Sequence, residues 1–452
     1  MINKLRTSYW FRSGFFTIGD RLSAMIMGLG SLMLLTKFHL SLADVGIWVI
    51  FLTITSILEV GRIGLQSNAL IKYLSDCTEE EYPKIVTASW VLNFIVTGFA
   101  VLFLLGLAGF IGMKYDSAAL TQILKIYGIT TFVLIPFFQC NFIQQANLDF
   151  KGVFVSSFVK NGILFGYIVA MYFLLSKEEM LLVDLAKWQL VAAAFASLVA
   201  YWLTRKYLKF SSSIDWAWVK TLFDYGKYVF GTNMSAMLYK SIDKLMLGGL
   251  VSAAAAGLYE LAIRVTNMTD VPTLAMANIL FPQSAKQAND GENAMKKLYE
   301  KAVGAVLCVM FPAIIFVEIF AEYIILFIAT EEYLIAADLL RLTILYGFFM
   351  PFTVQFGTVM DAARNPKINF RFTILSMILN IVFNYIFITN FGIYGAAYGT
   401  LLTYTVVFGM MQLVLKREFD VNFLDCIKNA FSFYGEGFSI FKKYVFKENP
   451  AL

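Results

Sequence analysis

The chain has 452 residues, of which 59% are hydrophobic and 15% are charged, whereas soluble domains carry roughly 45–50% apolar and about 25% charged residues. This composition excludes an ordinary soluble globule, and a net charge of +5 spread along the chain excludes a nucleic-acid-binding protein. One histidine (His39), four distant cysteines and the lack of a GxxxxGKS or GxxxxGKT motif argue against a metal site, a disulfide framework and ATP hydrolysis by a phosphate loop. We therefore expect a polytopic membrane protein that is not an enzyme and that uses no metal or cofactor.

Apolar segments follow one another along the chain, and each is long enough to cross a bilayer at about 20 residues per helix. The twelve segments cover residues 14–36, 45–66, 86–112, 121–146, 152–175, 181–204, 221–250, 254–285, 297–330, 335–362, 367–388 and 392–415. The predicted fold class is an all-α membrane protein with about 12 transmembrane helices. In the tail, 418–452, Gly435 and Gly437 interrupt a mixture of aromatic residues and lysines, so we expect two amphipathic cytoplasmic helices at the membrane surface.

The distribution of Lys and Arg predicts the orientation of these helices. The N-terminus, the even-numbered connections with the span ends beside them, and the tail hold 23 of these residues, whereas the odd-numbered connections hold only Lys37, Lys114 and Lys177. Basic loops stay on the cytoplasmic side of a membrane, so both termini are expected in the cytoplasm.

Short similarities indicate an internal repeat. The segment Val45-Gly46-Ile47-Trp48 resembles Ala256-Gly257-Leu258-Tyr259, and Ile135-Pro136-Phe137 resembles Met350-Pro351-Phe352. Residues 1–210 and 221–416 are therefore predicted to be an N-terminal and a C-terminal lobe of six helices each. An even number of helices per copy gives a parallel repeat, which places the working site between the halves.

Charged residues inside the predicted spans mark the candidate site, because each costs about 2.5–3.5 kcal/mol near the centre of a helix. Glu260 and Arg264 are four residues apart and share one helix face. They form either an ion pair that joins two helices or a cationic site for a phosphate group, which a guanidinium binds bidentately. The amides of the fourth span bind sugar hydroxyls or join helices. The candidate substrate-binding residues are Arg21, Arg62, Lys240, Arg264, Gln144 and Gln145.

Carboxylates in the same spans are candidates for coupling transport to an ion. These residues are Glu59, Asp243, Glu260 and Asp270. Each has a structural alternative: Glu59 is three residues from Arg62, Asp243 lies beside Lys244, and Asp270 is next to a predicted kink at Pro272.

Several motifs resemble one known family, the polysaccharide and O-antigen flippases of the multidrug/oligosaccharidyl-lipid/polysaccharide exporter superfamily. Asp243-Lys-Leu-Met-Leu-Gly-Gly-Leu followed by Ala256-Gly-Leu-Tyr-Glu-Leu-Ala262 is similar to the family's pattern in helices seven and eight. Phe281-Pro282 and Asn390-Phe-Gly-Ile-Tyr-Gly-Ala-Ala397 resemble its later turns, and Gly64-Leu65-Gln66 fits less closely. The similarity covers roughly residues 10–415, and it rests on the order and spacing of the motifs.

The resemblance implies a twelve-helix, two-lobe fold like that of the multidrug exporters. It also implies alternating access that moves undecaprenyl-pyrophosphate-linked oligosaccharides outward across the bacterial inner membrane for O-antigen, capsule or exopolysaccharide synthesis. A related lipid II flippase has arginines on helices one, two and eight that receive pyrophosphate, and Arg21, Arg62 and Arg264 occupy those helices here. The implied partners are the lipid-linked oligosaccharide, membrane lipids, and a polysaccharide polymerase or glycosyltransferase.

Two alternative functions stay open. A multidrug antiporter of the same superfamily requires an acid-dominated cleft for organic cations, which the basic residues in the spans argue against. A membrane polysaccharide polymerase usually needs a sizeable outer loop, but the longest odd-numbered connection has only about eight residues.

Overall fold

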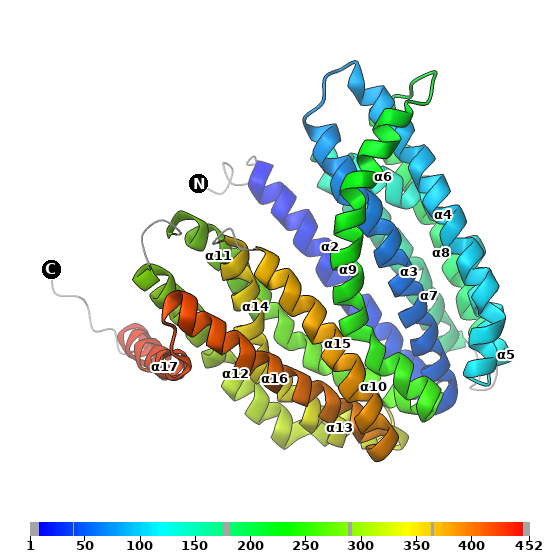
Figure 1. Cartoon of the computed structure of the whole chain (residues 1–452). Helices are drawn as coiled ribbons and strands as arrows, with labels where there is room; N and C mark the ends of the chain where they lie inside the picture. Colours follow the sequence, from blue (N-terminus) through cyan, green and yellow to red (C-terminus); the bar gives the residue numbers. More distant parts are fainter. Residues whose placement is uncertain (1–8, 39, 175–180, 288–291, 363–365, 446–452) are drawn as a thin grey trace. The chain divides into compact units, whose positions relative to one another are not determined.

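A computed structural model shows that the protein is built of helices (Figure 1). The structure describes residues 9–38, 40–174, 181–287, 292–362 and 366–445. No strand occurs within these ranges, so the predicted all-α class is confirmed. His39, Lys177, the first eight residues and the end of the predicted tail, 446–452, lie outside the described residues.

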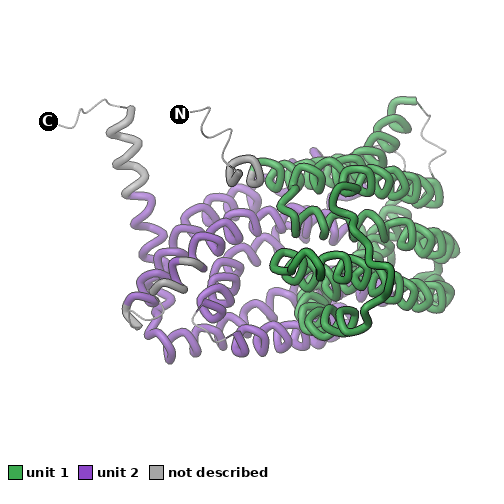
Figure 2. The backbone as a smooth tube through the Cα atoms, turned by 90° about the horizontal axis from the view of Figure 1, so that it is seen from above, with its two compact units in different colours: residues 1–241, 252–257 green, residues 242–251, 258–452 purple. Residues whose placement is uncertain are grey.

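The chain forms two compact units, which Figure 2 shows in different colours. Unit 1 comprises residues 1–241 and 252–257, and unit 2 comprises residues 242–251 and 258–452. The limits of the units fall inside two helices, α9 (Trp216–Leu250) and α10 (Ala253–Thr266). The repeat with halves at 1–210 and 221–416 stays a prediction, because the compact units are defined by packing and not by similarity between two parts of the sequence.

Unit 1 is a bundle whose apolar core joins α3, α4, α6 and α8. Serine side chains cap two of its helices: Ser41 accepts a hydrogen bond from the amide of Asp44, and Ser117 accepts one from the amide of Leu120. Its elements are α2 (Tyr9–Phe38), α3 (Leu42–Ser75), α4 (Glu81–Lys114), α5 (Ala118–Val133), α6 (Ile135–Ala146), α7 (Phe150–Leu174), α8 (Leu182–Thr204), the 3-10 turn η1 (Arg205–Tyr207) and the first part of α9.

The fourth predicted span, 121–146, is broken in two. α5 and α6 meet at Leu134 with a bend of 43°. The cause is Pro136, which has no amide hydrogen to donate back to the preceding turn. Side chains of other helices satisfy the carbonyls near the bend, and one of them is Ser197 of α8, whose hydroxyl donates to the Val133 carbonyl at 2.6 Å. Such replacement is required at membrane depth, where water is absent.

Glycines allow two close helix approaches in unit 1. A Cβ added at Gly46 of α3 would lie only 1.8 Å from the carbonyl oxygen of Ala253, and one added at Gly257 would lie 3.1 Å from the Cα of Gly46. Likewise, a Cβ added at Gly226 of α9 would lie 1.8 Å from the carbonyl oxygen of Leu65 of α3. Small residues of this kind let helix backbones pack closely in membranes. Gly46 and Gly257, which occupy matching positions in the predicted repeat, thus contact each other.

Unit 2 has a core rich in aromatic side chains, among them Phe352 and Phe356 of α14 and Tyr299 of α12. Its elements are the end of α9, most of α10, the 3-10 turn η2 (Asn267–Thr269), α11 (Asp270–Gln287), α12 (Glu292–Ile328), the 3-10 turn η3 (Glu331–Tyr333), α13 (Ile335–Ile344), α14 (Tyr346–Ala362), α15 (Pro366–Phe391), α16 (Ile393–Phe419) and α17 (Phe423–Val445). The predicted kink near Pro272 is the turn η2, which divides the eighth predicted span into α10 and α11.

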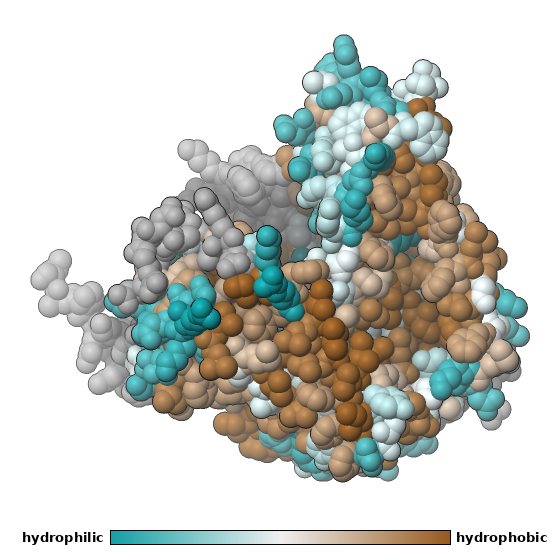
Figure 3. Space-filling model, viewed as in Figure 1, coloured by the Kyte–Doolittle hydropathy of each residue, from teal (hydrophilic) through white to brown (hydrophobic). Residues whose placement is uncertain are grey.

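Nine described helical stretches are long and apolar enough to cross a membrane, and α5 with α6 makes a tenth if the bent pair is one span. The face in Figure 3 shows hydrophobic residues along the helix flanks and hydrophilic residues near several helix ends. α9 and the α10–α11 pair are not among the helices that length and composition assign as spans. They correspond to the seventh and eighth predicted spans, which carry charged candidate residues. When they are added to the ten described spans, the total agrees with the twelve predicted segments.

The tail differs from its prediction. α17 is one continuous helix, Phe423–Val445, that passes through Gly435 and Gly437 without a break. A glycine inside a helix costs only about 1 kcal/mol, and α17 packs along α12. Just before α17 the amide of Asn422 donates to Glu300 at 3.0 Å, and in the middle of α17 the hydroxyl of Tyr434 donates to the carbonyl of Cys308 at 2.5 Å.

Candidate functional site

In unit 1, Arg62 lies inside the helix bundle. It is 3% exposed, and its Nη1 donates to Thr97 Oγ1 at 3.3 Å and to the carbonyl of Thr131 at 2.8 Å. Its guanidinium carbon is 5.0 Å from the centre of the Phe138 ring. Arg62 therefore satisfies a carbonyl next to the break between α5 and α6. Its Nη2, together with the side-chain amide of Gln66 one turn further along α3, has no hydrogen-bond partner among the described residues.

Glu59 lies one turn before Arg62 on α3. It is half-buried, and its Oε1 accepts a hydrogen bond from the hydroxyl of the buried Tyr127 on α5. Arg62 is within electrostatic range of Glu59 and Tyr127. The two α3 candidates thus belong to one polar cluster within unit 1.

Arg21, the third cation expected on the first helices, is exposed on α2. Its neighbour Asp20 is half-buried, bonds to Ser157 of α7 and lies within electrostatic range of Lys160 on the same helix. The contact between α2 and α7 therefore adds Lys160, a basic residue of the fifth predicted span that was not among the candidate substrate-binding residues, because one lysine in an apolar segment gives no sign of which helices it faces.

In unit 2, Glu260 is shared by two cations. Lys244 Nζ of α9 lies 2.9 Å from its Oε2, and Arg264 Nε of α10 lies 2.8 Å from its Oε1. The side chains are 15%, 10% and 27% exposed for Lys244, Glu260 and Arg264 respectively. The ion pair that the i, i+4 spacing predicted is present, and it extends to α9.

Asp243 lies beside this pair and is 5% exposed. Its Oδ1 accepts the backbone amide of Lys244 at 2.8 Å. The carboxylate interacts electrostatically with Lys244, with Glu260 and with the buried Tyr259. Asp243, Lys244, Glu260 and Arg264 form the group that we call the unit 2 charge cluster.

A further buried polar group in unit 2 was missed by the sequence reasoning. Asn380 and Asn384 of α15 are both fully buried, and each donates to Thr400 Oγ1 of α16, at 3.1 and 3.2 Å. Their two Oδ1 atoms have no hydrogen-bond partner among the described residues. The signal was available in the sequence, since two asparagines four residues apart share one face of an apolar helix.

Three further candidates lie on α9, α11 and α6. Lys240 is exposed on α9, in unit 1, although it is only one turn from Lys244. Asp270 is half-buried at the first position of α11, directly after η2. Gln145 is half-buried near the end of α6.

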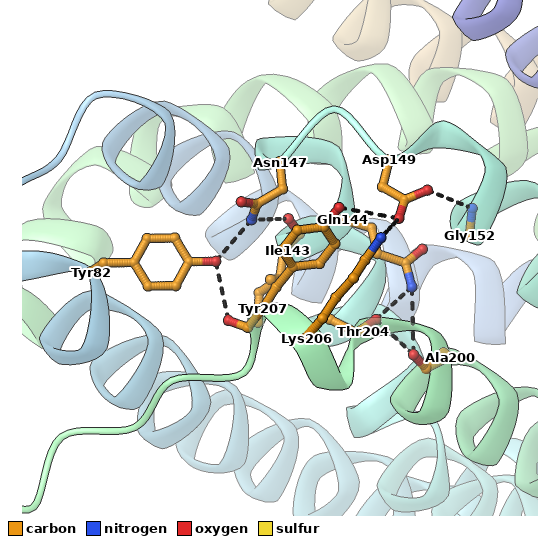
Figure 4. Close-up of polar contacts among 10 residues, drawn as sticks. All are labelled: Tyr82, Ile143, Gln144, Asn147, Asp149, Gly152, Ala200, Thr204, Lys206 and Tyr207. Carbon is orange, nitrogen blue, oxygen red and sulfur yellow. Dashed lines mark hydrogen bonds and ion pairs between the residues drawn. The ribbon is translucent and has the colours of Figure 1, made fainter. Parts of the chain in front are cut away.

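Gln144 belongs to a polar cluster at the end of α6 (Figure 4). It is fully buried, and its Nε2 donates to Thr204 Oγ1 and to the carbonyl of Ala200 at 3.5 Å, both on α8. These contacts join two helices of unit 1. Joining helices was the role predicted for these amides as the alternative to sugar binding.

The same close-up shows Asp149 of the α6–α7 connection, which contacts two residues of η1 (Figure 4). Its Oδ2 lies 2.9 Å from Lys206 Nζ, and the hydroxyl of Tyr207 donates to the same oxygen at 3.3 Å. Partial burial raises the pKa of Asp149, but the hydrogen bonds from Lys206 and from the amide of Gly152 outweigh it, so the pKa lies below its usual value.

The structure offers no grouping of metal ligands: the described residues hold no cluster of three or more His, Cys, Asp or Glu side chains that is placed for a metal ion. The four cysteines, Cys77, Cys140, Cys308 and Cys426, are free thiols.

Comparison with known proteins agrees with this arrangement. The sequence profile of the family described as polysaccharide biosynthesis protein matches residues 35–338, more than half of the chain. The chain belongs to the polysaccharide biosynthesis protein family. The match begins within α2 and ends within α13, so it includes α9, α10 and the unit 2 charge cluster.

Curated relatives of this family member include two proteins of Haloferax volcanii. The probable low-salt glycan biosynthesis flippase Agl15 is 27% identical over 188 residues, which are 41% of this chain and 40% of the relative. The probable flippase AglR is 22% identical over 195 residues, again 41% and 40% of the two chains. The matched region thus spans less than half of each relative.

Solved structures establish the fold. An inward-facing multidrug resistance MATE family transporter of the MOP superfamily aligns with a TM-score of 0.74 at 15% identity, covering 88% of this chain and 98% of that one. The lipid II flippase MurJ in an inward closed conformation aligns with a TM-score of 0.73 at 16% identity, covering 97% and 94%. The predicted exporter-like fold is confirmed.

Proposed function

We propose that this multi-pass membrane protein is a flippase that carries a lipid-linked glycan across the bilayer for polysaccharide synthesis. Membership of the polysaccharide biosynthesis family, the names of the Haloferax relatives and the fold shared with a lipid II flippase support this function. The single structural observation that carries it is the unit 2 charge cluster, because ionisable residues inside membrane helices mark substrate and ion pathways.

The proposed role of the cluster follows from its charges. Lys244 and Arg264 contribute two positive charges, and Asp243 and Glu260 contribute two negative charges, so the cluster is neutral when all four are ionised. A phosphate group then competes with carboxylates for Lys244 and Arg264. Neutralising one carboxylate, by a proton or a monovalent cation, leaves a net positive charge that favours the phosphate.

We propose Asp243 as the carboxylate that is neutralised, since Glu260 is held by two cations at once. Binding of the coupling ion and binding of the phosphate then favour each other, as linkage requires. Glu59 and Asp270 are further coupling candidates, and Arg21, Arg62, Lys240 and the amides of Gln144 and Gln145 are proposed contacts of the substrate during its passage.

The finer details extend the same proposal. The carrier is undecaprenyl pyrophosphate, the product serves O-antigen, capsule or exopolysaccharide synthesis, and the membrane is the bacterial inner membrane with both chain termini in the cytoplasm. A polysaccharide polymerase or glycosyltransferase is the expected partner. The relatives named above are archaeal, so the lipid carrier is the part of the proposal that the host organism decides.

The first experiment measures the amount and leaflet of lipid-linked oligosaccharide in the host after deletion. We expect the oligosaccharide to accumulate on the cytoplasmic leaflet and surface polysaccharide to be lost. Complementation with Arg264→Ala should restore at most about a tenth of the wild-type flipping rate, because a hydrogen bond to a charged group contributes roughly 1.5–3 kcal/mol. Arg341→Ala is the matched control, since Arg341 also pairs with two carboxylates, Glu322 and Asp338, outside the cluster.

A second variant tests the coupling. Asp243→Asn fixes the cluster at one net positive charge, so phosphate binding should lose its dependence on pH or on Na⁺ while affinity is retained. Unchanged lipid pools after deletion, together with new sensitivity to cationic dyes, would instead favour a multidrug antiporter, the function of the MATE transporter with the same fold.

A further inference from the structure

Lys160 occupies an unusual place for a lysine in a membrane protein. It lies ten residues after the start of α7 (Phe150–Leu174), which is about 15 Å along the helix axis. It is half-buried, and α7 is one of the helices long and apolar enough to cross a membrane.

Two aromatic rings lie beside the ammonium group of Lys160. Its Nζ is 4.9 Å from the centre of the Phe137 ring and 5.8 Å from that of the Phe138 ring, both on α6. The guanidinium of Arg62 lies 5.0 Å from the same Phe138 ring. Two cations from different helices, α3 and α7, thus contact one aromatic side chain inside unit 1.

The carboxylates near this pair are already engaged. Asp20 of α2 bonds to Ser157 and interacts electrostatically with Lys160, but the ion pairs within 4.0 Å among the described residues do not include Lys160. Glu59 accepts the hydroxyl of Tyr127. Contacts with ring faces offset only part of the cost of a lysine inside a membrane-spanning helix, so an anionic ligand would stabilise the ammonium group further.

We infer that Lys160 binds the phosphate of a polyprenyl-linked substrate within unit 1, and that Phe137 and Phe138 hold its ammonium group in place. This inference rests on the proposed flippase function and adds a binding residue that lies outside the unit 2 charge cluster. A lysine binds phosphate as a point charge. The neighbouring Arg62, whose guanidinium lies beside the same Phe138 ring, adds a second positive charge from α3.

The test uses the full chain in nanodiscs of zwitterionic lipid, with farnesyl pyrophosphate as the probe and farnesol as its uncharged counterpart. Lys160→Met should weaken pyrophosphate binding at least 10-fold, because a charge-assisted hydrogen bond is lost. Farnesol binding should stay within two-fold. Lys160→Arg should restore most of the affinity, since it keeps the charge. Lys187→Met, an exposed lysine on α8 that pairs with Asp184, is the matched control.

The outcomes separate the inference from the proposed function. Equal loss of farnesol and pyrophosphate binding in Lys160→Met, or unchanged pyrophosphate affinity, overturns the binding role of Lys160. Flipping of the lipid-linked glycan by wild-type protein in vesicles is measured in parallel. Absence of that flipping overturns the proposed function, whereas normal flipping with an unaffected Lys160→Met variant overturns only the inference.

Discussion

The contact between α3 and the start of α10 makes a strong prediction about Gly46. An alanine Cβ at this position lies 1.8 Å from the carbonyl oxygen of Ala253, 2.3 Å from its carbonyl carbon and 2.9 Å from the amide nitrogen of Ala254. All three atoms belong to the backbone, so no side chain can rotate away. Gly46→Ala therefore forces α3 and α10 apart.

The expected size of the effect follows from two opposing terms. Overpacking a well-packed interior costs about 1–3 kcal/mol, and a contact between two helix backbones belongs at the upper end of that range. Replacing glycine by alanine in a helix stabilises the helix by about 1 kcal/mol. The net loss of about 2 kcal/mol corresponds to a fall in the melting temperature of roughly 4–8 °C for a unit of this size, measurable by thermal unfolding of the purified protein in detergent.

Gly98 provides the matched control, because a Cβ at that position on α4 meets no atom within 4 Å. Gly98→Ala should leave the melting temperature unchanged or raise it slightly. Equal melting temperatures for the two variants would refute the close approach of α3 and α10.

The other predictions concern charges. Glu260→Gln leaves Lys244 and Arg264 without their shared carboxylate, and breaking such a buried pair costs about 3–5 kcal/mol. Adding Lys244→Met should recover part of this loss in denaturant unfolding. Asp149→Asn should destabilise the protein by about 1 kcal/mol at neutral pH, where Lys206 pairs with the carboxylate. Because the pKa of Asp149 is lowered in the folded protein, its contribution to stability is present above about pH 4 and is lost as the pH falls further. The free energies of unfolding of the wild type and of Asp149→Asn should therefore converge in acid. A constant difference between them down to about pH 3 would contradict this account.

The positions of the helices were largely predictable from the sequence, because a run of about 20 apolar residues has few alternatives in a bilayer. Breaks inside the helices were less predictable. Pro136 does break the fourth span, whereas Pro312 sits inside the continuous helix α12. Whether a proline bends a helix depends on which neighbouring helix can satisfy the freed carbonyl, and that neighbour is known only once the chain has folded.

The candidate charges illustrate the same limit. The spacing of Glu260 and Arg264 predicted their pair, since both lie on one helix. The contribution of Lys244 from α9 required knowledge of which helices pack together. Gln144 was predicted as a candidate sugar ligand, but its amide joins α6 to α8. Lys160 was not chosen as a candidate ligand, although two rings lie beside it and Arg62 contacts one of them. Sequence patterns report contacts within a helix and miss those between helices.

The glycine contact between α3 and α9 has a consequence for how the protein is made. α9 is not among the helices long and apolar enough to be assigned as a membrane span by composition alone, so we expect its entry into the bilayer to depend on helices that were synthesised before it. Gly226 provides the place where α9 can lie directly against Leu65 of α3. Because α3 is synthesised first, we expect it to hold the first part of α9 in the membrane while the rest of the helix is made.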